Sequence, residues 1–166
     1  MLILCIIIII VVIVGIIYFA LEGLLKEKME TYETDMLLIQ GKVKVLSQEA
    51  IIQKNEEVLK GKKLEDNIEE EKIKELLEKQ VISQEESNFS KYYIIEKETL
   101  EEIGLQNINL KKGFYIVNYN TDEIIYSEGV KIGENTYYKL SELKLQKENA
   151  NLPDEIENSS NQEEEN

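Results

Sequence analysis

The first 21 residues constrain the fold of this chain more than any other feature, because they carry no charged side chain. They read MLILCIIIIIVVIVGIIYFAL. At 1.5 Å per residue a helix of this length spans roughly 31 Å, which is about the thickness of a bilayer hydrocarbon core. A β-branched run has modest helix propensity in water, but in lipid only a helix satisfies every backbone hydrogen bond. Residues 1–21 are therefore predicted to form one transmembrane helix.

Two other interpretations of this run are a buried core helix and a cleaved signal peptide. The run is longer than a core helix needs. A signal peptide needs a basic start and small residues before the cut, whereas no Lys precedes this run and bulky Tyr18 stands two positions before Ala20. Lys26 and Lys28 follow the run, and by the positive-inside rule they mildly favour a cytoplasmic C-terminal part.

An amphipathic pattern follows the apolar run over residues 22–60. Apolar residues recur at alternating intervals of four and three, which predicts a helix with one apolar stripe. The stripe comprises Leu25, Met29, Tyr32, Met36, Ile39, Val43, Leu46 and Ala50. It is either a coiled-coil seam between copies or the face on which the C-terminal part of the same chain packs. Since a Tyr and an Ala belong to the stripe, we favour packing within the chain.

Residues 61–112 are interpreted as a polar helical linker. Gly61 with Lys62 and Lys63 ends the stalk helix, and the segment 66–79 is predicted to be a highly charged helix with a solvated surface. A short helical turn is predicted over 99–103, where the first residues have capping-box spacing and Gly104 follows as a stop.

The clearest β signal lies within residues 113–145. Three runs rich in aromatic and β-branched residues, 114–119, 123–127 and 136–140, are separated by turn residues and predict an antiparallel meander. A lone meander is marginal in water and needs a second surface, for which the apolar stripe is the obvious candidate. The predicted fold class is α+β: a long N-terminal helix, half transmembrane and half amphipathic, packed on a small three-stranded antiparallel sheet with short helices between.

The last segment, 146–166, is acidic and contains the single proline of the chain, Pro153. It does not hold enough apolar surface to offset the entropy cost of ordering. We predict that this tail is disordered.

The composition argues against several classes of function. The 166-residue chain has a formal net charge of −14, no His, and nineteen basic residues that are all Lys. Zinc sites and general bases that need His, and bidentate Arg clamps, are therefore excluded, and an acidic chain is a poor nucleic-acid binder. Asn118, Asn120 and Asp122 have the spacing of a calcium loop, but Glu123 stands where that loop needs Gly, so a turn is favoured. We expect no catalytic residue, cofactor, metal or small-molecule substrate.

Two stretches resemble pilin-like membrane proteins of low-GC Gram-positive bacteria. They are TDMLLIQGKVKVL at 34–46 and YIVNYNTDEIIY at 115–126, the latter continuing to YYKLSE at 137–142. Together with the apolar run, the arrangement resembles a type IV pilin or type II secretion pseudopilin over most of 1–143. Residues 1–21 show neither that family's basic leader for prepilin peptidase nor its helix Glu, the first acidic residue being Glu22. No processing residue is therefore carried over.

Two functions follow as hypotheses. The resemblance implies a single-pass structural or assembly protein of the cell membrane with an extracytoplasmic C-terminal domain. Its partners would be membrane lipid and further copies of itself or other pilin-like subunits. The alternative is a membrane-tethered coiled-coil scaffold, similar to the small single-pass proteins of cell division.

Overall fold

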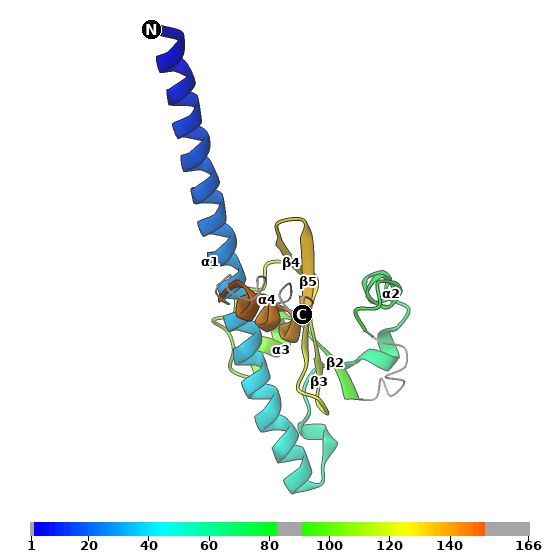
Figure 1. Cartoon of the computed structure of the whole chain (residues 1–166). Coiled ribbons are helices and arrows are strands. Elements are labelled where there is room, and N and C mark those ends of the chain that lie inside the picture. The colour runs from blue at the N-terminus through cyan, green and yellow to red at the C-terminus, as the bar shows by residue number, and fades with distance from the viewer. Residues whose placement is uncertain (1, 83–90, 152–166) are drawn as a thin grey trace, which may run out of the picture.

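A long N-terminal helix packed on a five-stranded antiparallel sheet forms the framework of this α+β fold (Figure 1). The computed structural model describes residues 2–82 and 91–151, with only some of the side chains of 2–25 and none of 149–151. The helical elements are α1 (Leu2–Gln53), η1 (Glu56–Val58), η2 (Leu64–Asn67), α2 (Glu71–Glu78), α3 (Lys97–Glu102) and α4 (Leu140–Asn151). The strands are β1 (Lys62–Lys63), β2 (Tyr92–Ile95), β3 (Tyr115–Asn118), β4 (Ile124–Ile132) and β5 (Asn135–Lys139).

The sheet is a meander in which strands β1 to β5 follow one another, each antiparallel to the next. The three strands predicted within 113–145 are present as β3, β4 and β5. The prediction that the sheet has only three strands is wrong, because β1 and β2 from the linker range 61–112 extend it. Strand β2 is an uninterrupted apolar run that is buried throughout. A strand covered on both faces has no alternating pattern, so periodicity did not identify it.

The two faces of the sheet belong to two separate hydrophobic cores, since successive side chains of a strand point to opposite faces. One core lies between the sheet and α1, α3 and α4, and its strand residues include Tyr93, Ile95, Tyr115, Val117, Ile124, Tyr126 and Val130. The other lies between the sheet and η2, α2 and residues 81–82, and its strand residues are Tyr92, Ile94, Ile116 and Ile125. The fold therefore has three layers, with the sheet in the middle (Figure 1).

Helix α1 ends at Gln53, earlier than the predicted end of the stalk at residue 60. Lys54 adopts the left-handed conformation, with φ of 50°, and the Asn55 N–H donates to the Ala50 carbonyl at 3.0 Å. This is the hydrogen bond of a Schellman C-cap. The Asn55 side chain then caps η1 by accepting from the Glu57 N–H at 2.9 Å. Because Lys54 rather than a Gly occupies the left-handed position, no stop signal stands in the sequence at this point.

Helix α2 corrects the prediction that the charged segment 66–79 is mainly a solvated helix. Ile73 and Leu76 are completely buried against the sheet, and Leu77 is partly buried beside them. The Lys and Glu side chains of the helix are exposed or partly buried. The three-residue apolar spacing was the signal of an amphipathic helix, and the high charge density of the segment obscured it.

Helix α3 begins at Lys97, so Thr99 lies inside it and the predicted capping box is wrong. The predicted stop is confirmed, because Gly104 has φ of 83° and the Leu105 N–H donates to the Leu100 carbonyl at 2.8 Å. The left-handed conformation costs Gly little, which is why Gly is the usual residue at this position.

Helix α4 reaches Asn151 and so enters the segment 146–166 that was predicted to be disordered. Its first turn is capped by Glu142, which accepts from the N–H groups of Tyr138 and Lys139 at 2.8 and 3.0 Å. Lys147 pairs with Glu33 of α1 at 3.0 Å. The contact between Lys147 and Glu33 joins residues distant in the sequence, so the composition of the tail alone understated its order. The rest of the predicted tail, 152–166, lies outside the described residues.

Within the fully described part of the chain, no helix is long and apolar enough to cross a membrane. Most side chains of the predicted anchor, 1–21, lie outside that part. The anchor therefore stays a prediction from the sequence.

Buried tyrosines make the first core sensitive to alkali. Burial raises the pKa of Tyr119 to about 12, and it also raises the pKa of Tyr115 and Tyr126 above the ordinary value of 10.0. The folded protein thus holds these phenol protons more tightly than the unfolded chain does. The resulting stabilisation is complete below about pH 10 and is lost as the pH rises towards 12. We expect spectrophotometric titration at high pH to show these tyrosines ionising together with unfolding, and a reversible early titration of all three would contradict this.

Candidate functional site

The predicted stripe lies in the first core, between α1 and the sheet, where the structure describes it. Leu25 lies outside the residues with described side chains. Tyr32 is partly buried, and its ring stacks on Tyr126 of β4 with centroids 5.0 Å apart. The remaining residues of the stripe are buried: Met29, Met36, Ile39, Val43, Leu46 and Ala50. In this fold the sheet of the same chain packs against the stripe and covers it.

Two polar contacts fix α1 in its orientation against the sheet. The Gln40 amide donates to the Asp122 carbonyl at 2.7 Å, and the Ser47 hydroxyl donates to the Tyr119 carbonyl at 3.0 Å. Both acceptors lie in the turn between β3 and β4. These bonds satisfy carbonyls that the turn would otherwise leave without backbone partners.

An open cleft of about 410 Å³ lies where α1 ends. The last turns of α1, residues 54–59, Lys91 and the turn after β3 line it. Lys91 pairs with Glu56 at 2.5 Å, and this hydrogen bond lowers the pKa of the Glu56 carboxyl. The Tyr119 hydroxyl accepts from the Lys60 N–H at 3.1 Å and donates to the Lys60 carbonyl at 2.9 Å.

Three polar groups of this surface cleft already have partners within the chain. Lys91 and Glu56 neutralise each other, and the Tyr119 hydroxyl holds the loop that leads into β1. A nucleophile needs an adjacent base and an activating environment. The described groups in the cleft do not combine these, so its residues can contact a partner but do not form a recognisable catalytic arrangement.

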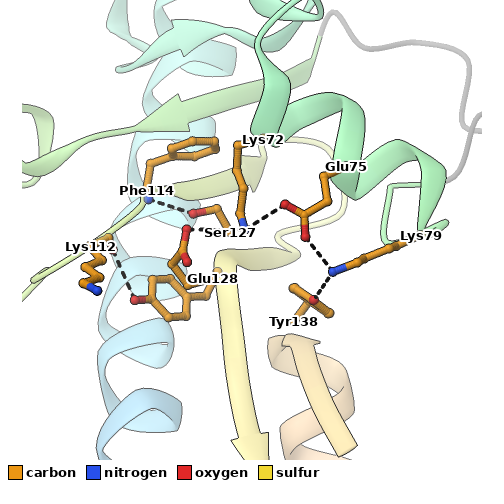
Figure 2. A network of polar contacts seen from close by, with 9 residues as sticks. Lys72, Glu75, Lys79, Lys112, Phe114, Ser127, Glu128 and Tyr138 are labelled. Atoms are coloured by element: carbon orange, nitrogen blue, oxygen red, sulfur yellow. Dashed lines mark hydrogen bonds and ion pairs between the residues drawn. The ribbon is translucent and has the colours of Figure 1, made fainter.

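A second polar network joins α2 to the long hairpin of β4 and β5 (Figure 2). Glu75 accepts from Lys72 at 3.0 Å and from Lys79 at 2.6 Å, and Lys79 also donates to the Tyr138 hydroxyl at 3.0 Å. The hydrogen bonds to Glu75 and Tyr138 raise the pKa of Lys79. Lys72 also lies 3.5 Å from Glu128, so the network spans from helix to sheet. These pairs are exposed or only partly buried, and such pairs contribute little individually.

Ser127, the residue before Glu128, is completely buried. Its hydroxyl accepts from the Phe114 N–H at 2.9 Å, beside the irregular register between β4 and β5 (Figure 2). We expect Ser127→Ala to destabilise the domain by about 1–3 kcal/mol, because the partly buried Phe114 N–H loses its acceptor. Urea unfolding of the full chain in detergent micelles measures this change, with exposed Ser141→Ala as the control. Equal stability of the two variants would contradict the assigned role.

No group of three or more His, Cys, Asp or Glu residues that could hold a metal ion occurs in the described part of the chain. At the predicted turn, the Asn118 side-chain oxygen accepts from the N–H groups of Asn120 and Thr121 at 2.8 and 3.1 Å. This is an Asx turn, in which the amide oxygen is used by the backbone. The turn interpretation of residues 118–122 is therefore confirmed.

Sequence reasoning missed the exposed apolar side chains on the other side of α1. Leu38, Val45 and Ile52 lie there, away from the sheet. Their seven-residue spacing was present in the sequence as a signal. The predicted stripe, whose residues Ile39 and Leu46 directly follow Leu38 and Val45, is the more regular pattern and was interpreted instead.

Comparisons with protein-family models, with curated proteins and with solved structures find no match for this chain.

Proposed function

We propose that this chain is a single-pass membrane protein with a pilin-like or pseudopilin-like structural or assembly role. Its C-terminal domain would lie outside the cytoplasm and carry no catalytic activity. The observation that supports this most is the continuity of α1, in which the apolar run and the segment packed on the sheet belong to one helix, Leu2–Gln53. A continuous helix holds a domain at a set distance and orientation from the end of its anchor.

The way the domain uses α1 gives further support. The long helix is part of the hydrophobic core, because its 26–53 segment packs on one face of the sheet together with α3 and α4. Any force or contact on the domain is thus transmitted directly to the predicted anchor. That mechanical coupling suits a structural subunit better than a domain joined to its anchor by a flexible linker.

A membrane-tethered coiled-coil scaffold is the second candidate. The predicted stripe would have been its seam, but the sheet of the same chain covers that stripe from Met29 to Ala50. What favours this candidate is the separate exposed apolar row on the outer side of α1.

Protease treatment of intact cells tests which side of the membrane the domain occupies. One epitope is placed after Asn166, and a second is placed in the exposed turn at Gly133 between β4 and β5. We expect a Gram-positive host expressing this chain to lose both epitopes without lysis. A known surface protein and a cytoplasmic protein serve as controls. Protection of both epitopes until lysis, with the surface control digested, would overturn the proposal and favour a cytoplasmic scaffold.

A further inference from the structure

The side of α1 that faces away from the sheet carries a row of exposed apolar side chains, which we term the outer row. Leu38, Val45 and Ile52 stand seven residues apart and are 50%, 54% and 81% exposed. Leu37 and Ile51 flank them and are also exposed. A contiguous apolar patch on an otherwise polar surface is a mark of an interaction site.

The outer row can accommodate the close approach of another helix. Gly41 lies between Leu38 and Val45, and nothing stands within 4 Å of the place where a Cβ would be. Thr34 and Gln48 continue the line of Gly41 at seven-residue intervals, and both are exposed. None of the three residues on this line carries a charge, so the centre of the outer side is uncharged between Thr34 and Gln48.

We propose that the outer row binds the outer row of a second copy, forming a parallel two-fold helix pair through residues 37–52. A seven-residue repeat keeps one side of a helix in contact with a partner helix along its length. A second copy carries the same repeat, and a two-fold axis brings identical patches together. Such a contact closes on itself, so it produces dimers and not an open filament.

Charges beside the outer row favour the parallel register. In a parallel pair, consider the residue i that directly precedes a row position. It lies near residue i+5 of the partner helix. This brings Lys44 of one copy near Glu49 of the other, and the symmetry makes two such pairs. Both side chains are exposed, and Glu49 otherwise accepts only from Gln53 among the described contacts, at 2.8 Å.

The same geometry limits how far the contact extends towards the membrane. The rule that pairs Lys44 with Glu49 brings Glu30 near Asp35 of the partner. These like charges repel, so the two helices are expected to separate on the N-terminal side of Leu37. The parallel direction rests on the proposed function, because anchors in one membrane point both helices the same way. The choice of face depends only on the outer row.

Disulfide trapping of the full chain in native membranes tests the pairing. The single native cysteine is removed by Cys5→Ser, and Leu38→Cys or Val45→Cys is introduced singly before mild oxidation. We expect most of the chain to be trapped as a dimer at either position. Leu37→Cys is a matched control one residue away, and Glu101→Cys at an exposed position of α3 is a distant one. In the proposed geometry identical residues at these control positions are too far apart to join.

The outcomes separate this inference from the proposed function. Monomers at Leu38→Cys and Val45→Cys, in membranes where the domain is folded, would overturn the pairing even if protease shows the domain outside. Equal trapping at the control positions, or trapping only to a different protein, would overturn it as well. Dimers at both positions would support it, even if the epitopes prove cytoplasmic.

A charge exchange tests the register. Lys44→Glu is expected to weaken self-association about three- to tenfold, since both pairs become repulsive. The double variant Lys44→Glu with Glu49→Lys is expected to restore it, because the pairs reform with reversed sign. Fluorescence energy transfer between labelled copies in vesicles measures the association. A double variant as weak as the single one would overturn the parallel register.

Discussion

Ile39→Asp is expected to unfold the domain, with a loss of stability of more than about 4 kcal/mol. Ile39 is completely buried in the core between α1 and the sheet. The substitution removes a large apolar side chain and leaves a carboxylate without a partner in an apolar environment, and each of these effects is among the most destabilising known for single changes. Since small domains are typically stable by only about 5–15 kcal/mol, a large unfolded population is expected.

Leu38→Asp is the matched control, because Leu38 is the preceding residue of the same helix and is half exposed. It changes the same kind of side chain to the same carboxylate, so any difference arises from the surroundings. We expect its stability to lie within about 0.5 kcal/mol of the unchanged chain. Urea unfolding in detergent micelles measures both variants. The protein concentration is kept low enough for the protein to be monomeric, and the near-ultraviolet signal of the tyrosines reports unfolding.

The comparison of these two variants decides what the stripe does. If the stripe served as a seam between copies, Ile39→Asp would abolish association and leave the domain of the monomer folded. In the structure described here it must unfold the monomer. A folded, monomeric Ile39→Asp variant would therefore contradict the packing of α1 on its own sheet.

Gly61→Ala is expected to cost about 2–5 kcal/mol. Gly61 has φ of 108°, and an added Cβ would lie 2.5 Å from the Ile94 carbonyl oxygen and 2.8 Å from the Ile95 side chain. The positive φ alone is unfavourable for Ala, and the clash with backbone adds the cost of displacing a strand. Because Ile94 pairs with Lys62, the change is expected to separate β1 from β2.

Gly133→Ala separates the two contributions at Gly61. Gly133 also has a positive φ, of 60°, but nothing lies within 4 Å of its Cβ position. We expect this control to cost only about 1–2 kcal/mol, the penalty for the left-handed conformation. Hydrogen exchange at the Ile94 amide gives a local reading of the β1–β2 pairing. If the two variants were equally stable, the close approach of Gly61 to β2 would be wrong.

The pattern of apolar residues was sufficient to predict α1 as an amphipathic helix and the three C-terminal strands. In each case the signal is local, since a period of 3.6 or a group of β-branched and aromatic residues between turns is a property of neighbouring residues. The pairing of the stripe with a sheet was also predictable, because an antiparallel meander is not stable without a second surface.

The second layer could not be predicted in the same way. Strand β2 has no alternation because both of its faces are covered, and α2 carries so much charge that its two fully buried residues, Ile73 and Leu76, were not recognised as core. The end of α1 at Gln53 depends on a left-handed Lys54, for which sequence propensity gives no expectation.

The sequence by itself thus determined an apolar run, an amphipathic helix and a meander, because these depend on contacts between near neighbours in the chain. Only the tertiary structure decided that the sheet has five strands and two cores, that α4 is held to α1 through Lys147 and Glu33, and that the row at Leu38, Val45 and Ile52 is left uncovered. The physical reason is that burial is a property of the assembled fold. Whether an apolar side chain is core or surface depends on which distant segments come to lie against it.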